Sequence, residues 1–168
     1  MAKAIGLPTR ITNDIVSLLL SNQDVCKLLT CSLKTEGIDD VEDIKKPWEL
    51  FNKNIFVGRR IPDLLLEEGC YITVRLHSWF EKSTSNKKVL DEGVISISVI
   101  SSINLVDTVH GPRDVALSCI IKDLLGDNTF NTIGKLNVYQ VIDIEKLPVN
   151  YSGYMLLCKF SGYSSVVV

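Results

Sequence analysis

The sequence lacks any long apolar run. Its continuous apolar stretches are all far shorter than the roughly 20 residues that a membrane-spanning helix requires. The opening stretch MAKAIGLPTR also lacks the apolar core of a signal peptide. We therefore expect no membrane partner and no secretory leader.

There is also little excess charge of either sign. The 18 Lys and Arg residues against 20 Asp and Glu residues give a net charge of −2. A protein that grips nucleic acid through many phosphate contacts needs a strongly basic surface, which this composition does not supply. The balance argues against a nucleic-acid-binding module, which stays an alternative, but it allows a protein that surrounds DNA without gripping it.

Groups of residues that could form a metal or cofactor site are missing too. The 2 histidines lie in unrelated segments, and none of the 5 cysteines forms a C-x-x-C pair. Metal sites need three or four converging ligands, and the acidic stretch TEGIDDVED does not have the spacing of a calcium loop. Neither G-x-x-x-x-G-K-[ST] nor G-x-G-x-x-G occurs. We expect no metal, no cofactor, and reduced, mostly buried thiols as in a cytosolic protein.

A cysteine–histidine pair for nucleophilic catalysis is the remaining chemical possibility. Cys119 would have to meet His77 or His110, and a third group would have to orient the imidazole. His110 precedes the helix predicted around Cys119, and Cys119 lies well inside that helix, so we expect these two side chains not to meet. A small hydrolase or transferase that uses one of the histidines stays an alternative. Our expectation is a protein that is not an enzyme and has no catalytic residue.

The chain does have the length and composition of one globular domain. Its 168 residues are 46% hydrophobic and 23% charged, which is typical of a folded domain and not of a disordered chain. We expect an N-terminal arm over 1–10, a single domain over 11–162 and a C-terminal tail over 163–168.

Helical periodicity appears first near the N-terminus. Apolar residues recur with helical spacing after a cap at Thr12 or Asn13, and again after a second cap at Asn22. The acidic segment 35–43 that follows has the composition of a surface loop. These patterns predict an N-terminal helical pair and a loop.

Strand periodicity dominates the rest of the chain. Alternation is clearest over 71–80 and 94–101, on either side of the polar segment EKSTSNKKVLDEG, and it predicts a hairpin with an unusually long tip. Further strands are predicted over 54–60, 135–144 and 154–160. The element order predicts an α+β fold: an antiparallel sheet with a long hairpin, flanked by the N-terminal helical pair and one central helix.

The central helix is predicted within HGPRDVALSCIIKDLLGD, residues 110–127. Gly111 is an acceptable cap, Pro112 fits the first helical position, and Gly126 fits the end of the helix. Val115 and Cys119 lie off the main apolar stripe and form a second, weaker strip. Such a strip predicts a contact with another subunit.

Five further residues allow two interpretations each. Arg75, His77 and Trp79 alternate along one predicted strand and so share one of its faces, either as half-exposed sheet residues or as a subunit contact. Trp48 and Phe51, in KKPWELFNKN, either anchor the preceding loop on the core or dock a partner.

The succession of these elements resembles the neck proteins of tailed bacteriophages, particularly the tail terminator and head–tail joining group. The resemblance covers residues 11–162 and rests on NDIVSLLLSNQDVCKLL, YITVRLHSWF…VISISVIS, PRDVALSCIIKDLLGD, TIGKLNVYQV and YSGYMLLCKF in that order. In that group, subunits form a ring, commonly of six, that caps the tail tube beneath the head connector, and DNA passes through its lumen. The N-terminal helical pair and the acidic connector depart from a minimal terminator pattern.

The resemblance implies a structural, ring-forming component of the virion neck that assembles in the host cytoplasm. Its implied partners are copies of itself, most simply as a hexamer, the tail tube protein and the head connector or adaptor proteins, with DNA passing through the lumen without sequence-specific contacts. A head completion or adaptor protein and a tail-tube-like protein are alternatives within the same virion. A closed ring needs complementary patches on two sides of each subunit. We expect intersubunit contacts at Arg75, His77, Trp79, Arg113, Val115 and Cys119, and inter-ring contacts at Lys82, Lys87, Lys88, Trp48 and Phe51.

Overall fold

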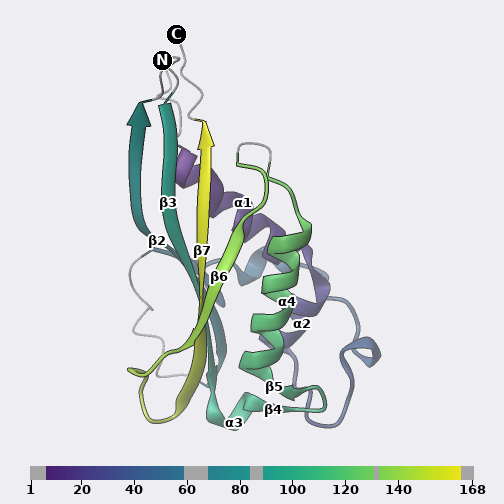
Figure 1. The fold of residues 1–168 in the computed structure, drawn as a ribbon. Helices are drawn as coiled ribbons and strands as arrows, with labels where there is room; N and C mark the ends of the chain where they lie inside the picture. Colours follow the sequence, from purple (N-terminus) through teal and green to yellow (C-terminus); the bar gives the residue numbers. More distant parts are fainter. Residues whose placement is uncertain (1–6, 59–67, 84–88, 131–132, 164–168) are drawn as a thin grey trace.

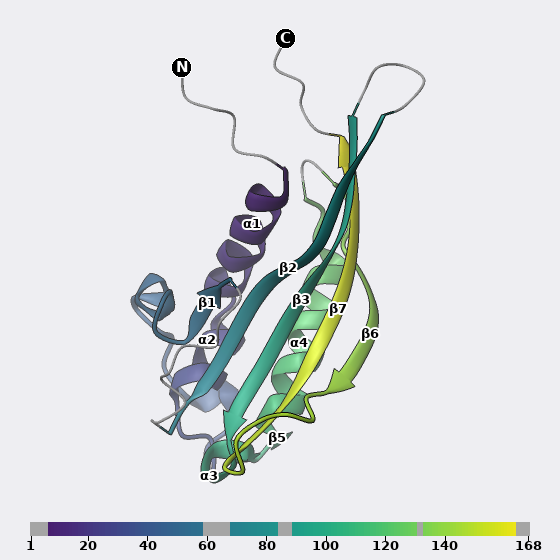
Figure 2. The same cartoon turned by 90° about the vertical axis from the view of Figure 1, so that its left-hand side faces the viewer.

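The chain folds into two layers, a curved sheet with helices on one of its faces (Figures 1 and 2). The computed structural model describes residues 7–58, 68–83, 89–130 and 133–163. Among these residues no helix packs on the opposite face of the sheet. The predicted α+β fold is therefore confirmed.

The N-terminal helical pair is confirmed as α1 (Leu7–Ser21) and α2 (Gln23–Thr30). Asn22 caps α2 as predicted, because its side-chain oxygen accepts the N–H of Val25 at 2.9 Å. The predicted start of α1 is wrong: the helix begins at Leu7, so part of the predicted arm is helical. The first turn tolerates Pro8 since the N–H that proline lacks would have no helical partner there.

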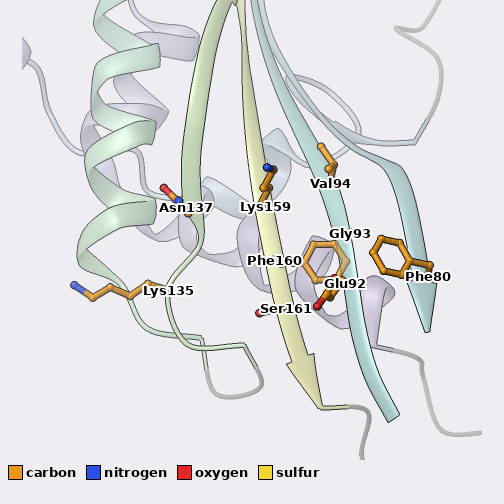
Figure 3. A pocket seen from close by; sticks show the side chains of 9 residues that line it. All are labelled: Phe80, Glu92, Gly93, Val94, Lys135, Asn137, Lys159, Phe160 and Ser161. Atoms are coloured by element: carbon orange, nitrogen blue, oxygen red, sulfur yellow. The ribbon is translucent and has the colours of Figure 1, made fainter. Parts of the chain in front are cut away.

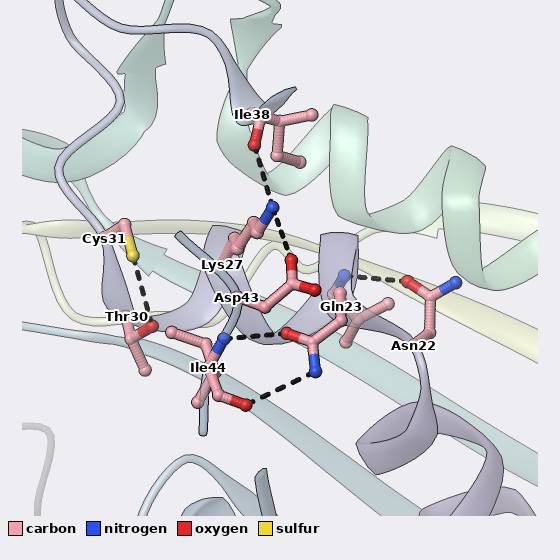
Figure 4. Close-up of polar contacts among 9 residues, drawn as sticks. Asn22, Gln23, Lys27, Thr30, Cys31, Ile38, Asp43 and Ile44 are labelled. Carbon is pink, nitrogen blue, oxygen red and sulfur yellow. Dashed lines mark hydrogen bonds and ion pairs between the residues drawn. The ribbon is translucent and has the colours of Figure 1, made fainter. Parts of the chain in front are cut away.

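The acidic connector after α2 is tied to that helix by polar contacts (Figure 4). Gln23 exchanges two hydrogen bonds with the backbone of Ile44, at 2.8 and 3.3 Å. The buried Lys27 donates to the carbonyl of Ile38 at 3.2 Å and forms an ion pair with Asp43 at 2.9 Å. The connector is therefore a fixed part of the domain, with two 3-10 helices, η1 (Ile38–Asp40) and η2 (Pro47–Leu50).

The main sheet has five strands in the order β1-β2-β3-β7-β6. They are β1 (Ile55–Val57), β2 (Cys70–Ser83), β3 (Val89–Ser102), β6 (Asn137–Asp143) and β7 (Tyr151–Tyr163). All neighbouring strands are antiparallel except β1, which pairs with β2 in parallel. The predicted antiparallel sheet is thus right for four strands and misses one parallel edge pair. Two short strands, β4 (Asp107–Thr108) and β5 (Gly111–Pro112), form a separate ladder before the central helix.

The predicted long hairpin is confirmed, but the prediction that its polar segment forms a long tip is wrong. The β2–β3 ladder continues through the polar residues as far as the pair Ser83 and Val89. The far ends of these strands reach past α4 (Figure 1), and the apolar half of the alternation is missing from their sequence. Lys82 therefore lies within β2, whereas Lys87 and Lys88 fall outside the described residues.

The core lies between the sheet and the helices. At alternate positions of β3, the side chains of Ile95, Ile97 and Val99 face the helix layer and are fully buried. Leu117 and Ile121 of α4 (Arg113–Asp127) pack in one cluster with these β3 residues, which agrees with the predicted apolar stripe of the helix. Burial of each of these side chains contributes roughly 1.5–3 kcal/mol, so this interface fixes α4 on β3 and β7.

The two ends of α4 differ from the prediction. Pro112 is the N-cap and not the first helical residue, because Gly111 and Pro112 are engaged in β5; Gly111 has φ +93°, which glycine adopts without strain. Gly126 lies inside the helix, and Asn128 ends it. The side chain of Asn128 donates to the carbonyl of Leu124 at 2.8 Å, which satisfies a terminal carbonyl without a left-handed residue.

Candidate interaction surfaces

Arg113 is buried inside its own chain, so its prediction as an intersubunit contact is wrong. The side chain is 2% exposed. Its guanidinium donates to the carbonyls of Leu105 at 2.7 Å and Cys31 at 2.9 Å, and also to the carbonyl of Leu28. Burial lowers the pKa of Arg113, and the nearby thiols of Cys70 and Cys31 act in the opposite direction. Arg113 thus places a cation against the carbonyl end of α2, where it favours the helix dipole.

Asp114 is the second buried charged residue at the start of α4. Its carboxylate accepts the hydroxyl of Ser152 at 2.7 Å and the N–H of Val115 at 2.9 Å. It therefore meets the first turn of the helix as a capping acid does, and it also ties α4 to β7.

The predicted shared face of Arg75, His77 and Trp79 is wrong because β2 contains a bulge. The register shifts between Leu76 and Ser78, which leaves His77 as the extra residue. Arg75 pairs with Ser96 on the helix-free side, whereas Trp79 pairs with Gly93, in line with the core residues of β3. Burial and, to a lesser degree, the charge of Arg75 lower the pKa of His77. Trp79 remains half-exposed, and its subunit contact stays a prediction.

Val115 and Cys119 lie in the wall of an apolar groove between α4 and β6. The groove has a volume of about 290 Å³, and Val141 and Tyr154 of the sheet also line it. Val115 is 37% exposed and Val141 is 43% exposed. The second strip of the helix is therefore accessible, as predicted, but it borders the edge of the sheet. We call the hollow formed by Val115, Cys119, Val141 and Tyr154 the α4/β6 groove.

Trp48 and Phe51 do not anchor the connector on the core. Trp48 is 63% exposed and Phe51 is 43% exposed, while Leu50 between them is buried and provides the anchor. Val57, in the adjacent strand β1, is exposed as well. We call Trp48, Phe51 and Val57 the β1-edge patch.

The sequence did not indicate an open hollow on the helix-free face of the sheet (Figure 3). It has a volume of about 500 Å³ and is lined by Phe80, Glu92, Gly93, Val94, Lys135, Asn137, Lys159, Phe160 and Ser161. The ammonium of Lys159 lies 4.7 Å from the ring centroid of Tyr139, a cation–π distance. Residues from four strands meet here, so no local pattern could have found it.

One side chain considered for catalysis, His110, has a structural role: its Nε2 accepts the N–H of Ile38 at 2.9 Å and so holds the connector.

Three cysteines other than Cys119 are buried thiols. Burial raises the pKa of Cys26 to about 11, and that of Cys70 and Cys158 to about 12, which keeps these thiols protonated and weakly nucleophilic at neutral pH.

In the described part of the chain, no group of three or more His, Cys, Asp or Glu side chains is placed to hold a metal ion. Nor does any helix in the described ranges have the length and apolar character needed to cross a membrane.

Comparison with known proteins gives a match to one family over most of the chain. No curated protein matches. Among solved structures, a chain from the virion of a native gene transfer agent particle is similar at a TM-score of 0.45 and 12% identity, over 64% of this chain and 78% of that one. The YomW family model matches residues 22–160, from the cap of α2 to β7. The chain belongs to the YomW family.

Proposed function

We propose that this chain is a structural, ring-forming component of a bacteriophage neck. In this role it resembles a tail terminator: it caps the tail tube and joins it to the head connector, with DNA passing through the lumen. The chain acts as a building block and has no catalytic role. The proposal combines the resemblance in element order with the surfaces of the folded subunit.

The observation that carries the proposal is the placement of two different apolar surfaces. The β1-edge patch lies beside one edge strand of the sheet, and the α4/β6 groove lies beside the other. Figure 2 shows β1 and β6 at opposite edges of the sheet. A symmetric dimer joins one patch to its own copy, whereas a ring joins two different patches head to tail. Surfaces on opposite flanks of one subunit suit the ring.

An open strand edge supports the same arrangement. In the described ranges β6 pairs only with β7, so its other edge has backbone groups free for a neighbour. Tyr139 and Val141 on this strand are each 43% exposed. An unpaired edge beside apolar side chains is a common site of subunit association.

The charge balance suits the proposed passage of DNA. A net charge of −2 provides few cations in excess, and phosphate gripping needs such cations. The proposed ring therefore surrounds DNA without binding it tightly or reading its sequence. Its expected size of six subunits is what the resemblance to the neck proteins implies.

A head completion or adaptor protein of the same virion is the second candidate. The observation that favours it is the fixed helical pair with its connector, held by Lys27, Gln23 and His110. This extra layer departs from a minimal terminator.

Imaging of the virion tests the proposal. In a reconstruction of the phage that encodes the chain, we expect a ring at the neck whose subunit density fits the sheet and α4. A ring on the tail tube supports the terminator, and a ring against the head connector supports the adaptor. Absence of the chain from purified virions, or its location at the tail tip, would refute both.

A further inference from the structure

We propose that the indole of Trp48 in one copy docks into the α4/β6 groove of the next copy. This inference deepens the proposed function and rests on its head-to-tail ring. It moves Trp48 from the inter-ring contacts to the contacts between neighbouring subunits.

Trp48 is presented on a short element that is already ordered. Leu50, 5% exposed, anchors η2 in the core, and the N–H of Phe51 donates to the carbonyl of Trp48 at 3.2 Å. Lys46 and Glu49 form an ion pair at 3.1 Å across the same turn. Because the backbone that carries Trp48 is ordered, docking of this large aromatic side chain costs little backbone freedom, which favours its use as an anchor.

The groove offers a matching apolar site. Its volume of about 290 Å³ suits one aromatic side chain, and the wall side chains Val115 and Val141 are partly exposed. Ser118 at its margin already donates its hydroxyl to the carbonyl of Asp114 at 2.7 Å. The indole would therefore cover apolar surface without displacing that hydrogen bond.

Trp48 can reach the groove only from another copy. Trp48 precedes β1, and the groove borders β6, so the two lie on opposite edges of the same five-stranded sheet. The fold keeps them apart within one chain, because β2, β3 and β7 separate the two edge strands. A second copy can bring its own β1 edge against the β6 edge.

Charges around the two surfaces allow one favourable pairing. Glu49, the residue after Trp48, lies 3.1 Å from Lys46, and Lys122 lines the groove. Docking of Trp48 with Glu49 toward Lys122 joins opposite charges across the interface.

The buried area sets the expected strength. One aromatic side chain buries about 150–250 Å², whereas a stable interface buries about 800 Å² on each partner. Trp48 is therefore an anchor within a larger contact that includes the open edge of β6. Its loss should weaken association by roughly tenfold or more, as loss of an interface hot spot does.

Tryptophan fluorescence tests the docking directly, because the chain has 2 tryptophans. In the Trp79→Phe variant, the emission of Trp48 should shift to the blue and become protected from acrylamide as the protein assembles. Adding Val115→Arg should abolish that shift. The matched control is Val149→Arg, which places the same charge at a highly exposed position outside the groove and should leave the shift unchanged.

A charge exchange gives a second readout. Lys122→Glu should weaken assembly severalfold, and Glu49→Lys in the same chain should restore it. If rings form while Trp48 stays exposed to water, or form equally well in the Val115→Arg variant, the docking is overturned and the proposed ring is left intact. A chain that stays monomeric at every concentration and on isolated tails would overturn the docking and the proposed ring together.

Discussion

At the scale of single residues, Arg113 was misjudged from the sequence for a physical reason. Its place in the chain indicates only the start of a helix. Its burial depends on acceptors from a distant segment, the carbonyls of Leu28 and Cys31. No local pattern reports such partners, so Arg113 was predicted to be a surface group.

Arg113 should therefore be a stability residue. We expect Arg113→Ala to lower the free energy of unfolding by about 3 kcal/mol, because three backbone carbonyls lose a charged donor. Urea unfolding measures this. Lys122→Ala, an exposed change on the same helix, should stay within about 0.5 kcal/mol of the wild type. Equal effects of the two substitutions would contradict the assigned role of Arg113.

The buried thiols predict a loss of stability at high pH. Burial raises the pKa of Cys70 and Cys158 to about 12 from the ordinary value of 9.0. Above pH 9 the unfolded chain releases these protons while the folded chain retains them. The free energy of unfolding should therefore fall as the pH rises from 9 toward 12, by up to about 1.4 kcal/mol per pH unit for each thiol.

Urea unfolding under reducing conditions between pH 8 and pH 10.5 measures this dependence. Cys158→Ala should give a shallower decline than the wild type, since one of the contributing thiols is gone. Cys119→Ala, at an exposed position, is the matched control. If Cys158→Ala and the wild type decline in parallel, the buried thiol does not contribute as described.

At the scale of elements, the strand periodicity predicted the sheet but not its irregularities. The alternation of Ile95, Ile97 and Val99 reports a buried face directly. The bulge at His77 and the parallel pairing of β1 depend on contacts across strands, which the sequence of one strand does not report. The polar ends of the hairpin were taken for a loop because they lack the apolar half of the pattern.

Gly153 and Gly126 differ in the space around them, so alanine should have opposite effects on stability at the two positions. A Cβ on Gly153 of β7 would collide with the carbonyl oxygen of Val99 and lie 3.1 Å from Cα of Ile100, so Gly153→Ala should destabilise the sheet by about 2 kcal/mol or more. Gly126 in α4 has open space around it, so Gly126→Ala should stabilise by about 0.5–1 kcal/mol. Thermal unfolding compares them, and a neutral Gly153→Ala would refute the close approach of β7 to β3.

At the scale of the whole molecule, the sequence was sufficient for the fold class, the helical pair and the accessibility of Val115 and Cys119. It could not place the β1-edge patch and the α4/β6 groove on opposite flanks, because that placement follows from the strand order β1-β2-β3-β7-β6. Val141 and Tyr154 were missed as groove residues since they meet α4 only in the folded chain. The proposed ring therefore depends on tertiary structure more than on any motif.

The mass of the assembled chain tests the central claim most directly. Native mass spectrometry over a range of concentrations should show monomers and one closed oligomer, with six subunits as the expected size and no dominant dimer. Head-to-tail contacts that close give such a single large species. A dimer that persists at all concentrations would indicate a self-complementary patch, and it would contradict a ring built from two different surfaces.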